Sequence, residues 1–215
     1  IYPSKTFASH FSMITGLTAE HSGITANEFY DPVRHETFSS GNEKSKSDGS
    51  WYLGHTLWEV AAYKQMLSAS YFWVSSDVKV HGTQPTYWIP YDDKVPNASR
   101  VAQVLKWLEL PPEKRPHLIN LYFSNVDRAG HLFGAASDEV KKQVLELDDV
   151  FGSLMAGVVL LRAQGLPVNV VIVSDHGMDN VNSKYEYVDD EADLSSFIVS
   201  SHGPEMQMSL KEGAD

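Results

Sequence analysis

The chain has 215 residues, of which 42% are hydrophobic, and this is enough for one ordinary domain with a sizeable buried core. Its formal net charge of −11 argues against non-specific nucleic-acid binding, which needs lysine and arginine to displace counterions from phosphates. The absence of cysteine excludes disulfides, thiolate zinc fingers and cysteine nucleophiles. A metal would therefore bind through histidine, carboxylate or hydroxyl groups, and no apolar run is long enough to span a bilayer.

The first half of the chain contains three predicted helices and one predicted strand. Apolar residues at helical spacing follow Thr6 and predict a helix that begins there; further helices are predicted over 57–66 and 99–108. The apolar residues 70–74 predict a buried strand. The segment 35–50 is rich in serine, glycine, lysine and glutamate, and we expect it to be a solvated excursion.

The second half continues the alternation of strands and helices. The apolar runs 118–124 and 168–174 predict two more buried strands. Between them, Ser137 is a predicted N-cap of a long helix that reaches Leu161 and is stopped by Gly165 and Pro167. Helices that alternate with nearly all-apolar strands predict an α/β domain with a mostly parallel sheet.

Two similar polar pairs follow the last two predicted strands. Asp127 and His131 come after the run 118–124, and Asp175 and His176 come directly after 168–174. If these strands are parallel, both pairs emerge at the same edge of the sheet, where ligands gather in α/β folds. The pattern predicts a dinuclear site for zinc, manganese or iron. The alternative is that these are turn residues beside structural histidines.

Thr6 is a candidate nucleophile. Its hydroxyl would lie at a helix N-terminus, where free backbone N–H groups and the helix dipole favour an anion. The alternative on local grounds is that Thr6 serves only as an N-cap.

Several motifs in order resemble one known family. KTFASHFSMITGL resembles the nucleophile motif of the nucleotide pyrophosphatase/phosphodiesterase family, within the alkaline phosphatase superfamily. VDRAGHLFG and VIVSDHGM resemble its metal motifs, and PTYWIPYDD resembles its substrate-pocket segment. The resemblance covers essentially the whole chain. It implies an alkaline-phosphatase-like α/β fold with a mostly parallel central sheet flanked by helices.

The resemblance implies a role for each polar residue of the two pairs. Thr6 would be the nucleophile and would bind one zinc ion together with Asp175 and His176. Asp127 and His131 would hold the second zinc ion. The implied reaction is hydrolysis of phosphodiester or pyrophosphate bonds, most naturally of nucleotides, through a phospho-threonine intermediate.

The resemblance also implies substrate contacts and a location. Asn27 would steady a phosphate oxygen, and Phe7 and Tyr91 would pack against the nucleoside or an equivalent group. Considered alone, either aromatic residue would be a core residue. The family further implies a secreted or membrane-anchored extracellular protein, although we recognise no targeting signal in the sequence itself.

Two ligands that the family uses have no counterpart here, one on a strand before the nucleophile and one far beyond the second metal motif. We therefore expect residues 1–215 to be the central part of a single catalytic domain. His202, in SSHGPEMQ, is expected to be structural. His55 and Thr56 stand where the family commonly reads Gly-Glu-Pro.

Other hypotheses are a sulfatase or phosphomonoesterase of the same superfamily, or an inactive binding homologue with the same fold. A sulfatase commonly needs cysteine or serine in its motif, whereas this chain offers Thr6. A monoesterase would usually place a guanidinium near the phosphate, and Arg128 is the arginine nearest the motifs. A degenerate homologue would have a broken motif, and the motifs present are intact.

Overall fold

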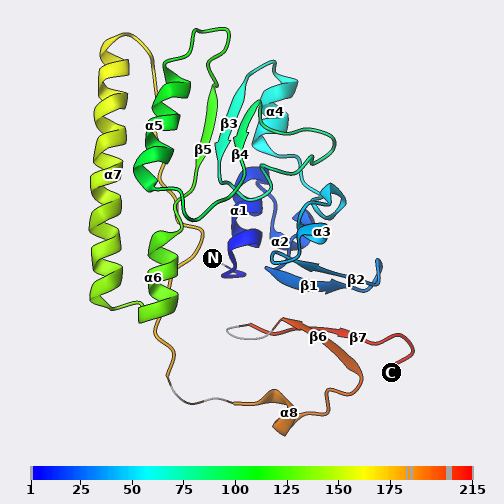
Figure 1. Ribbon diagram of the computed structural model, residues 1–215. Coiled ribbons are helices and arrows are strands. Elements are labelled where there is room, and N and C mark those ends of the chain that lie inside the picture. Colours follow the sequence, from blue (N-terminus) through cyan, green and yellow to red (C-terminus); the bar gives the residue numbers. More distant parts are fainter. Residues whose placement is uncertain (1, 183, 185, 202–204, 215) are drawn as a thin grey trace.

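Three parallel strands form the centre of the fold (Figure 1). In the computed structural model, which describes residues 2–182, 184, 186–201 and 205–214, β4 (Tyr87–Ile89) and β5 (Leu118–Leu121) pair with opposite edges of β3 (Ser68–Tyr71). The register places Ala69 opposite both Tyr87 and Ile119. All four residues of β3 are buried, as expected for the middle strand of a parallel sheet covered on both faces.

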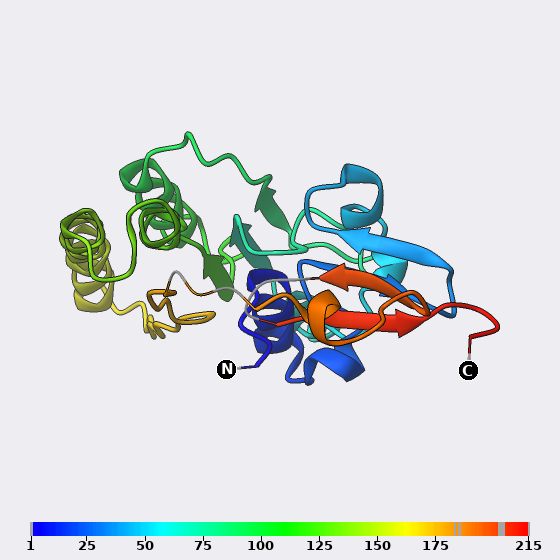
Figure 2. The ribbon, with the colours of Figure 1, turned by 90° about the horizontal axis from the view of Figure 1, so that it is seen from below.

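Helices surround this sheet on both sides (Figures 1 and 2). Their bounds are α1 (Thr6–Thr15), α2 (Ala19–Ser22), α3 (Glu43–Lys46), α4 (Leu57–Tyr63), α5 (Asn97–Leu108), α6 (Asn125–Phe133), α7 (Asp138–Ala163) and α8 (Val188–Glu191), with a short 3₁₀ turn η1 (Gly49–Trp51). The helices α5 and α7 pack on one side, and α1 and α4 lie on the other. The α/β architecture with a parallel sheet is confirmed.

The predicted long helix has the expected N-terminus. The Ser137 side chain accepts a hydrogen bond from the backbone N–H of Val140, which satisfies one of the free donors of the first turn of α7. At the other end, Gly165 adopts φ +90°, a left-handed conformation that glycine reaches without a steric penalty.

The described residues form two hydrophobic cores. The first joins α1 and α4 to the segments between them, and its largest buried side chains include Phe11, Phe38, Tyr52 and Trp58. The second lies between β3, α5 and α7 and includes Tyr71, Trp107 and Val158. The second core therefore packs α5 and α7 against the sheet, whereas the first packs α1 and α4 against the segments between them.

Two antiparallel hairpins lie side by side away from the central sheet (Figures 1 and 2). One is β1 (Glu28–Asp31) with β2 (Glu36–Ser39), and the other is β6 (Phe197–Ser201) with β7 (Gln207–Leu210). The Gln207 amide Nε2 donates a hydrogen bond to the Thr25 carbonyl at 3.3 Å. Segments distant in sequence are thereby joined near the start of β1.

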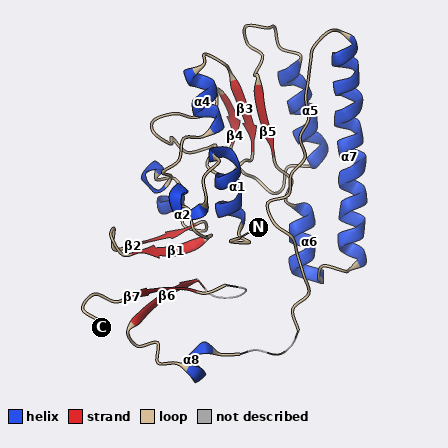
Figure 3. Cartoon of the chain, turned by 180° about the vertical axis from the view of Figure 1, so that it is seen from behind, coloured by secondary structure: helices blue, strands red, loops and turns tan. Residues whose placement is uncertain are grey.

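The prediction of a buried strand over 168–174 is wrong. This segment runs as extended chain after α7, without a ladder among the described residues (Figure 3). Val171, Ile172 and Val173 are exposed, whereas Val168 and Val170 pack against the second core. An apolar run favours an extended backbone, but a strand forms only where a neighbouring strand accepts its hydrogen bonds.

The prediction of a solvated excursion over 35–50 is also wrong in part. This segment forms β2, α3 and the start of η1, and the Phe38 side chain is fully buried in the first core. Most residues of this segment are polar, so its composition did not indicate that Phe38 faces the core.

Among the described residues, no helix is both long and apolar enough to cross a membrane.

Candidate metal centre

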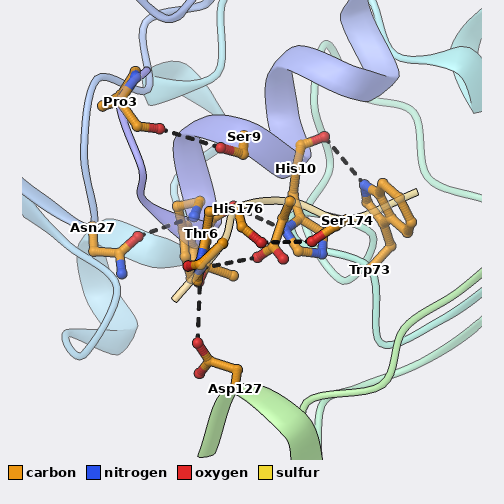
Figure 4. Close-up of polar contacts among 12 residues, drawn as sticks. Pro3, Thr6, Ser9, His10, Asn27, Trp73, Asp127, Ser174 and His176 are labelled. Atoms are coloured by element: carbon orange, nitrogen blue, oxygen red, sulfur yellow. Dashed lines mark hydrogen bonds and ion pairs between the residues drawn. The ribbon is translucent and has the colours of Figure 1, made fainter. Parts of the chain in front are cut away.

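Helix α1 places Thr6 at its first turn, where backbone N–H groups lack helical partners. Lys5, not Thr6, is the N-cap residue, so the hydroxyl of Thr6 is not used to cap the helix. It lies 3.2 Å from Nε2 of His176 (Figure 4). The interpretation of Thr6 as only an N-cap is therefore wrong.

Helix α6 follows β5 and carries the first polar pair. Asp127 and His131 lie one turn apart, and Asp127 Oδ1 is 3.4 Å from His131 Nε2. The Asp127 side chain is one-third exposed (33%), whereas that of His131 is largely exposed (68%). The spacing of four residues therefore brings both side chains to one face of the helix.

The extended segment after α7 places the second pair, Asp175 and His176, close to Asp127. Nε2 of His176 is 3.3 Å from Asp175 Oδ2 and 3.8 Å from Asp127 Oδ1. Its other ring nitrogen, Nδ1, lies 2.9 Å from the carbonyl oxygen of Gly177. Because a carbonyl can only accept, Nδ1 carries a proton, and in the neutral ring Nε2 is then the nitrogen with a lone pair. The hydroxyl of Thr6 can then donate to this nitrogen.

These side chains suit divalent cations. Oδ1 of Asp127 is buried and has no hydrogen-bond partner, although two histidine nitrogens face it. A buried carboxylate oxygen without a donor is costly unless a cation balances its charge. Successive contacts connect His131 to Asp127, Asp127 to His176 and His176 to Asp175, so all four side chains belong to one cluster.

His10 is a residue of this site for which the sequence analysis assigned no role. Its Nδ1 lies 2.8 Å from the carbonyl oxygen of Thr6 and 3.5 Å from Asp175 Oδ2, and its side chain is 2% exposed. The ring makes edge contacts with Trp73 and Tyr122. The signal was its position four residues after Thr6, which places both on one face of α1. His10 positions Asp175 and the first turn of α1.

The electrostatic field of the site is negative. Burial, followed by the charges of Asp175 and Asp127, raises the pKa of Tyr122 above its ordinary value. Burial also lowers the pKa of His10, and this effect outweighs the opposing attraction of Asp175. Neutral His10 therefore leaves the carboxylates without a compensating protein cation at this contact.

Asn27 lies beside the N-terminus of α1. Its Oδ1 accepts a hydrogen bond of 3.0 Å from the backbone N–H of Phe7 (Figure 4). This contact ties the start of β1 to the first turn of α1 and fixes the orientation of the amide. The Nδ2 group carries the amide protons, so it is the group of Asn27 that can donate hydrogen bonds.

The two predicted aromatic contacts have different surroundings. Phe7 is half-buried, packs against the first core and lies 5.9 Å from Phe38 between ring centroids. Tyr91 is 53% exposed and donates a hydrogen bond of 3.0 Å to Ser124 Oγ. His202 lies outside the described residues.

The fold is that of the alkaline phosphatase superfamily. Residues 1–214 match the family described as type I phosphodiesterase/nucleotide pyrophosphatase, and the chain belongs to that family. The resemblance noted in the sequence is thereby confirmed.

Individual relatives agree with this assignment. The chain is 39% identical to human ectonucleotide pyrophosphatase/phosphodiesterase family member 1 over 189 residues, covering 87% of the chain and 20% of that protein. It is 37% identical to a venom phosphodiesterase of Naja atra over 202 residues, covering 93% and 24%. The chain thus spans about a fifth to a quarter of the length of these curated relatives.

Solved structures of relatives share the fold. Murine ectonucleotide pyrophosphatase/phosphodiesterase 5 superposes with a TM-score of 0.89 at 27% identity, covering 99% of this chain and 57% of that one. An inactive threonine-to-alanine variant of the same murine protein, in complex with AMP, superposes with a TM-score of 0.88 at 27% identity, covering 99% and 56%.

Proposed function

We propose that this chain hydrolyses phosphodiester or pyrophosphate bonds of nucleotides, with Thr6 as the nucleophile. The observation that carries the proposal is the 3.2 Å contact between Thr6 Oγ1 and His176 Nε2 at the N-terminus of α1. The murine relative solved as an inactive threonine-to-alanine variant with AMP supports both the nucleophile and the substrate class.

In this proposal, two zinc ions bind at the cluster formed by these polar side chains. Thr6, Asp175 and His176 hold one, and Asp127 and His131 hold the other, with oxygen and nitrogen donors that suit zinc. When bound, the ions supply Lewis-acid stabilisation of phosphoryl charge and lower the pKa of the nucleophile. The negative field around Asp127 and Asp175 favours cations at this position.

The proposed reaction has two displacement steps at phosphorus. The Thr6 hydroxyl gives up its proton to solvent, its oxygen attacks phosphorus and a new P–O bond forms. The bond to one ester oxygen breaks, and that group leaves and takes up a proton from solvent. The phospho-threonine still carries the other ester group of the substrate. Water attacks the same phosphorus in the second step, which releases the phosphomonoester and restores the Thr6 hydroxyl.

The surroundings of Thr6 orient the phosphate. Asn27 Nδ2 donates to a non-bridging phosphate oxygen, because Oδ1 is engaged by the backbone of Phe7. The free N–H groups of the first turn of α1 favour the same negative charge. His10 keeps the Thr6 carbonyl and the Asp175 carboxylate in place through its Nδ1 contacts.

Zinc commonly has four ligands, and the described residues offer three to one ion and two to the other. We therefore also propose that residues 1–215 form the central part of a larger catalytic domain whose other parts complete both coordination shells. The names of the relatives support an extracellular location, with nucleotides as substrates.

The experiment compares Thr6→Ala with Thr6→Ser in the whole gene product that contains this chain, using a p-nitrophenyl nucleotide ester. Loss of the nucleophile should lower kcat/KM by roughly 1,000-fold or more, while serine should retain part of the activity. Circular dichroism confirms that both variants fold. Near-normal turnover by folded Thr6→Ala would contradict the assignment of the nucleophile.

A further inference from the structure

Three metal-ligating side chains converge near the start of α4, outside the candidate metal centre. His55 Nδ1 lies 2.9 Å from Glu59 Oε1, and His81 Nδ1 lies 3.3 Å from Glu59 Oε2. One ligand atom from each residue lies within 4.8 Å of the other two. The two imidazole rings are 5.0 Å apart between centroids.

Two separate pieces of the chain bring these residues together. His55 stands two residues before α4, and Glu59 lies in its first turn, where Thr56 caps the helix by accepting a 3.2 Å hydrogen bond from the Glu59 N–H. His81 lies in the connection from β3 to β4, in a turn where Val80 bridges to Thr83. A ligand shared by all three would therefore join α4 to this connection.

The three side chains differ in how firmly they are held. Glu59 is the most buried, with 19% of its side chain exposed, while His55 is 75% and His81 38% exposed. Burial favours protonated Glu59, but the hydrogen bonds from His55 and His81 outweigh it and hold the pKa of Glu59 below its usual value. The Glu59 carboxylate is therefore an anion held between the imidazole rings of His55 and His81, which are more exposed and can reorient.

The cluster borders a pocket of about 450 Å³. Its lining includes His55, Glu59, Tyr63 and Thr83. One side of the cluster therefore remains open to water or to a small ligand.

We propose that His55, Glu59 and His81 bind a zinc ion, separate from the two ions of the candidate metal centre. Two imidazole nitrogens and one carboxylate oxygen form a ligand set that zinc accepts, with a fourth position left for water on the side of the pocket. For Nδ1 to bind the ion, the proton of each neutral imidazole moves from Nδ1 to Nε2, so both rings bind as the other tautomer. The ion fixes the connection between β3 and β4 to the first turn of α4.

The test isolates this site by removing the other one. In the whole gene product, the double variant Asp127→Asn, His176→Ala loses ligands of the candidate metal centre but keeps this cluster. After equilibration in a zinc buffer and gel filtration, we expect elemental analysis to give one more zinc per chain for this double variant than for the same protein that also carries His55→Ala. His81→Ala in the same background should give the same loss of zinc, because it removes another of the three ligands.

His21→Ala is the matched control, because His21 is 68% exposed and its nearest carboxylate, Glu20 at 3.7 Å, is a surface neighbour. It should leave the zinc content unchanged. In the otherwise unaltered protein, His55→Ala should keep phosphodiesterase turnover and lose the extra rise in Tm that zinc gives. Equal zinc content with and without His55 and His81 would overturn the proposal, and so would a loss of zinc in His21→Ala as large as theirs.

This result is independent of the proposed function. Failure of the phosphodiesterase assay would leave the zinc difference between the double and triple variants unaffected. If His55→Ala fails to fold, His55→Gln, which keeps a polar side chain of similar length, replaces it and must show the same loss of zinc.

Discussion

Thr6 Oγ1 lies 3.2 Å from Nε2 of His176, although 170 positions separate the two residues in the chain. The contact joins the first turn of α1 to the extended segment after α7 (Figure 4). It places a hydroxyl, an imidazole and the carboxylate of Asp175 together.

Removing His176 should remove metal as well as activity. His176→Ala deletes the nitrogen that faces Thr6, Asp127 and Asp175, so we expect zinc content to fall and kcat/KM to drop by roughly 1,000-fold or more. Elemental analysis and hydrolysis of a nucleotide ester measure both. Chelation of the unaltered protein should abolish activity, and zinc should restore it; activity that survives chelation would argue against the metal centre.

Asp127→Asn separates metal binding from structural support. The buried Oδ1 atom has no hydrogen-bond partner, so without metal the carboxylate adds desolvation cost and repulsion. We expect the variant to lose zinc but to match or exceed the Tm of the unaltered protein when both are measured in chelator. A Tm several degrees lower in chelator would instead mean that the Asp127–His131 contact stabilises the fold.

The aromatic residues test the substrate class. Phe7→Leu keeps apolar volume against Phe38 but removes the ring, and stacking on a base contributes about 1–3 kcal/mol. We expect KM to rise roughly 5-fold to 100-fold for nucleotide esters and much less for a small aryl phosphodiester. Equal changes for both substrates would mean that Phe7 only packs in the core.

Tyr91 offers a second test with its own control. Tyr91→Leu should raise KM for nucleotides in the same way, whereas Tyr91→Phe keeps the ring and loses only the hydrogen bond to Ser124. If Tyr91→Phe were as impaired as Tyr91→Leu, the hydroxyl rather than the ring would be the important group.

Acid stability should depend on Asp48. Hydrogen bonds from Ser50, and then the contact with Arg34, lower the pKa of Asp48 in the folded chain. A lowered folded-state pKa gives stability that is present above the unfolded value, about 3.9, and is lost as pH falls through the folded value. Asp48→Asn should therefore be less stable at neutral pH, and the gap should close below about pH 4. Thermal unfolding across pH measures it; a constant gap would contradict the assigned cause.

Periodicity and caps were sufficient to predict much of the scaffold. Ser137 caps α7 as expected, and the helices predicted over 57–66 and 99–108 correspond to α4 and α5. The apolar run 118–124 contains β5, whereas 168–174 is equally apolar and forms no ladder among the described residues. Hydrophobicity indicates burial or extension, but pairing depends on which strand lies alongside.

The candidate site was only partly visible in the sequence. Asp127 and His131 were predicted from their position after a strand and from the motif resemblance, and the structure places both on one face of α6. His10 was overlooked, although its position four residues after Thr6 places both residues on one face of the predicted helix. The cluster of His55, Glu59 and His81 depends on how the connection after β3 returns to α4, which only tertiary structure determines.

The central claim is that Thr6 forms a covalent bond to phosphorus. The stereochemical course of hydrolysis tests it most directly, with a nucleotide ester that is chiral at phosphorus through a sulfur atom and is hydrolysed in ¹⁸O-labelled water by the whole gene product. Each in-line displacement inverts the phosphorus, so attack by Thr6 followed by attack of water predicts overall retention of configuration. Overall inversion would mean that water attacks the substrate directly, and it would contradict the phospho-threonine intermediate.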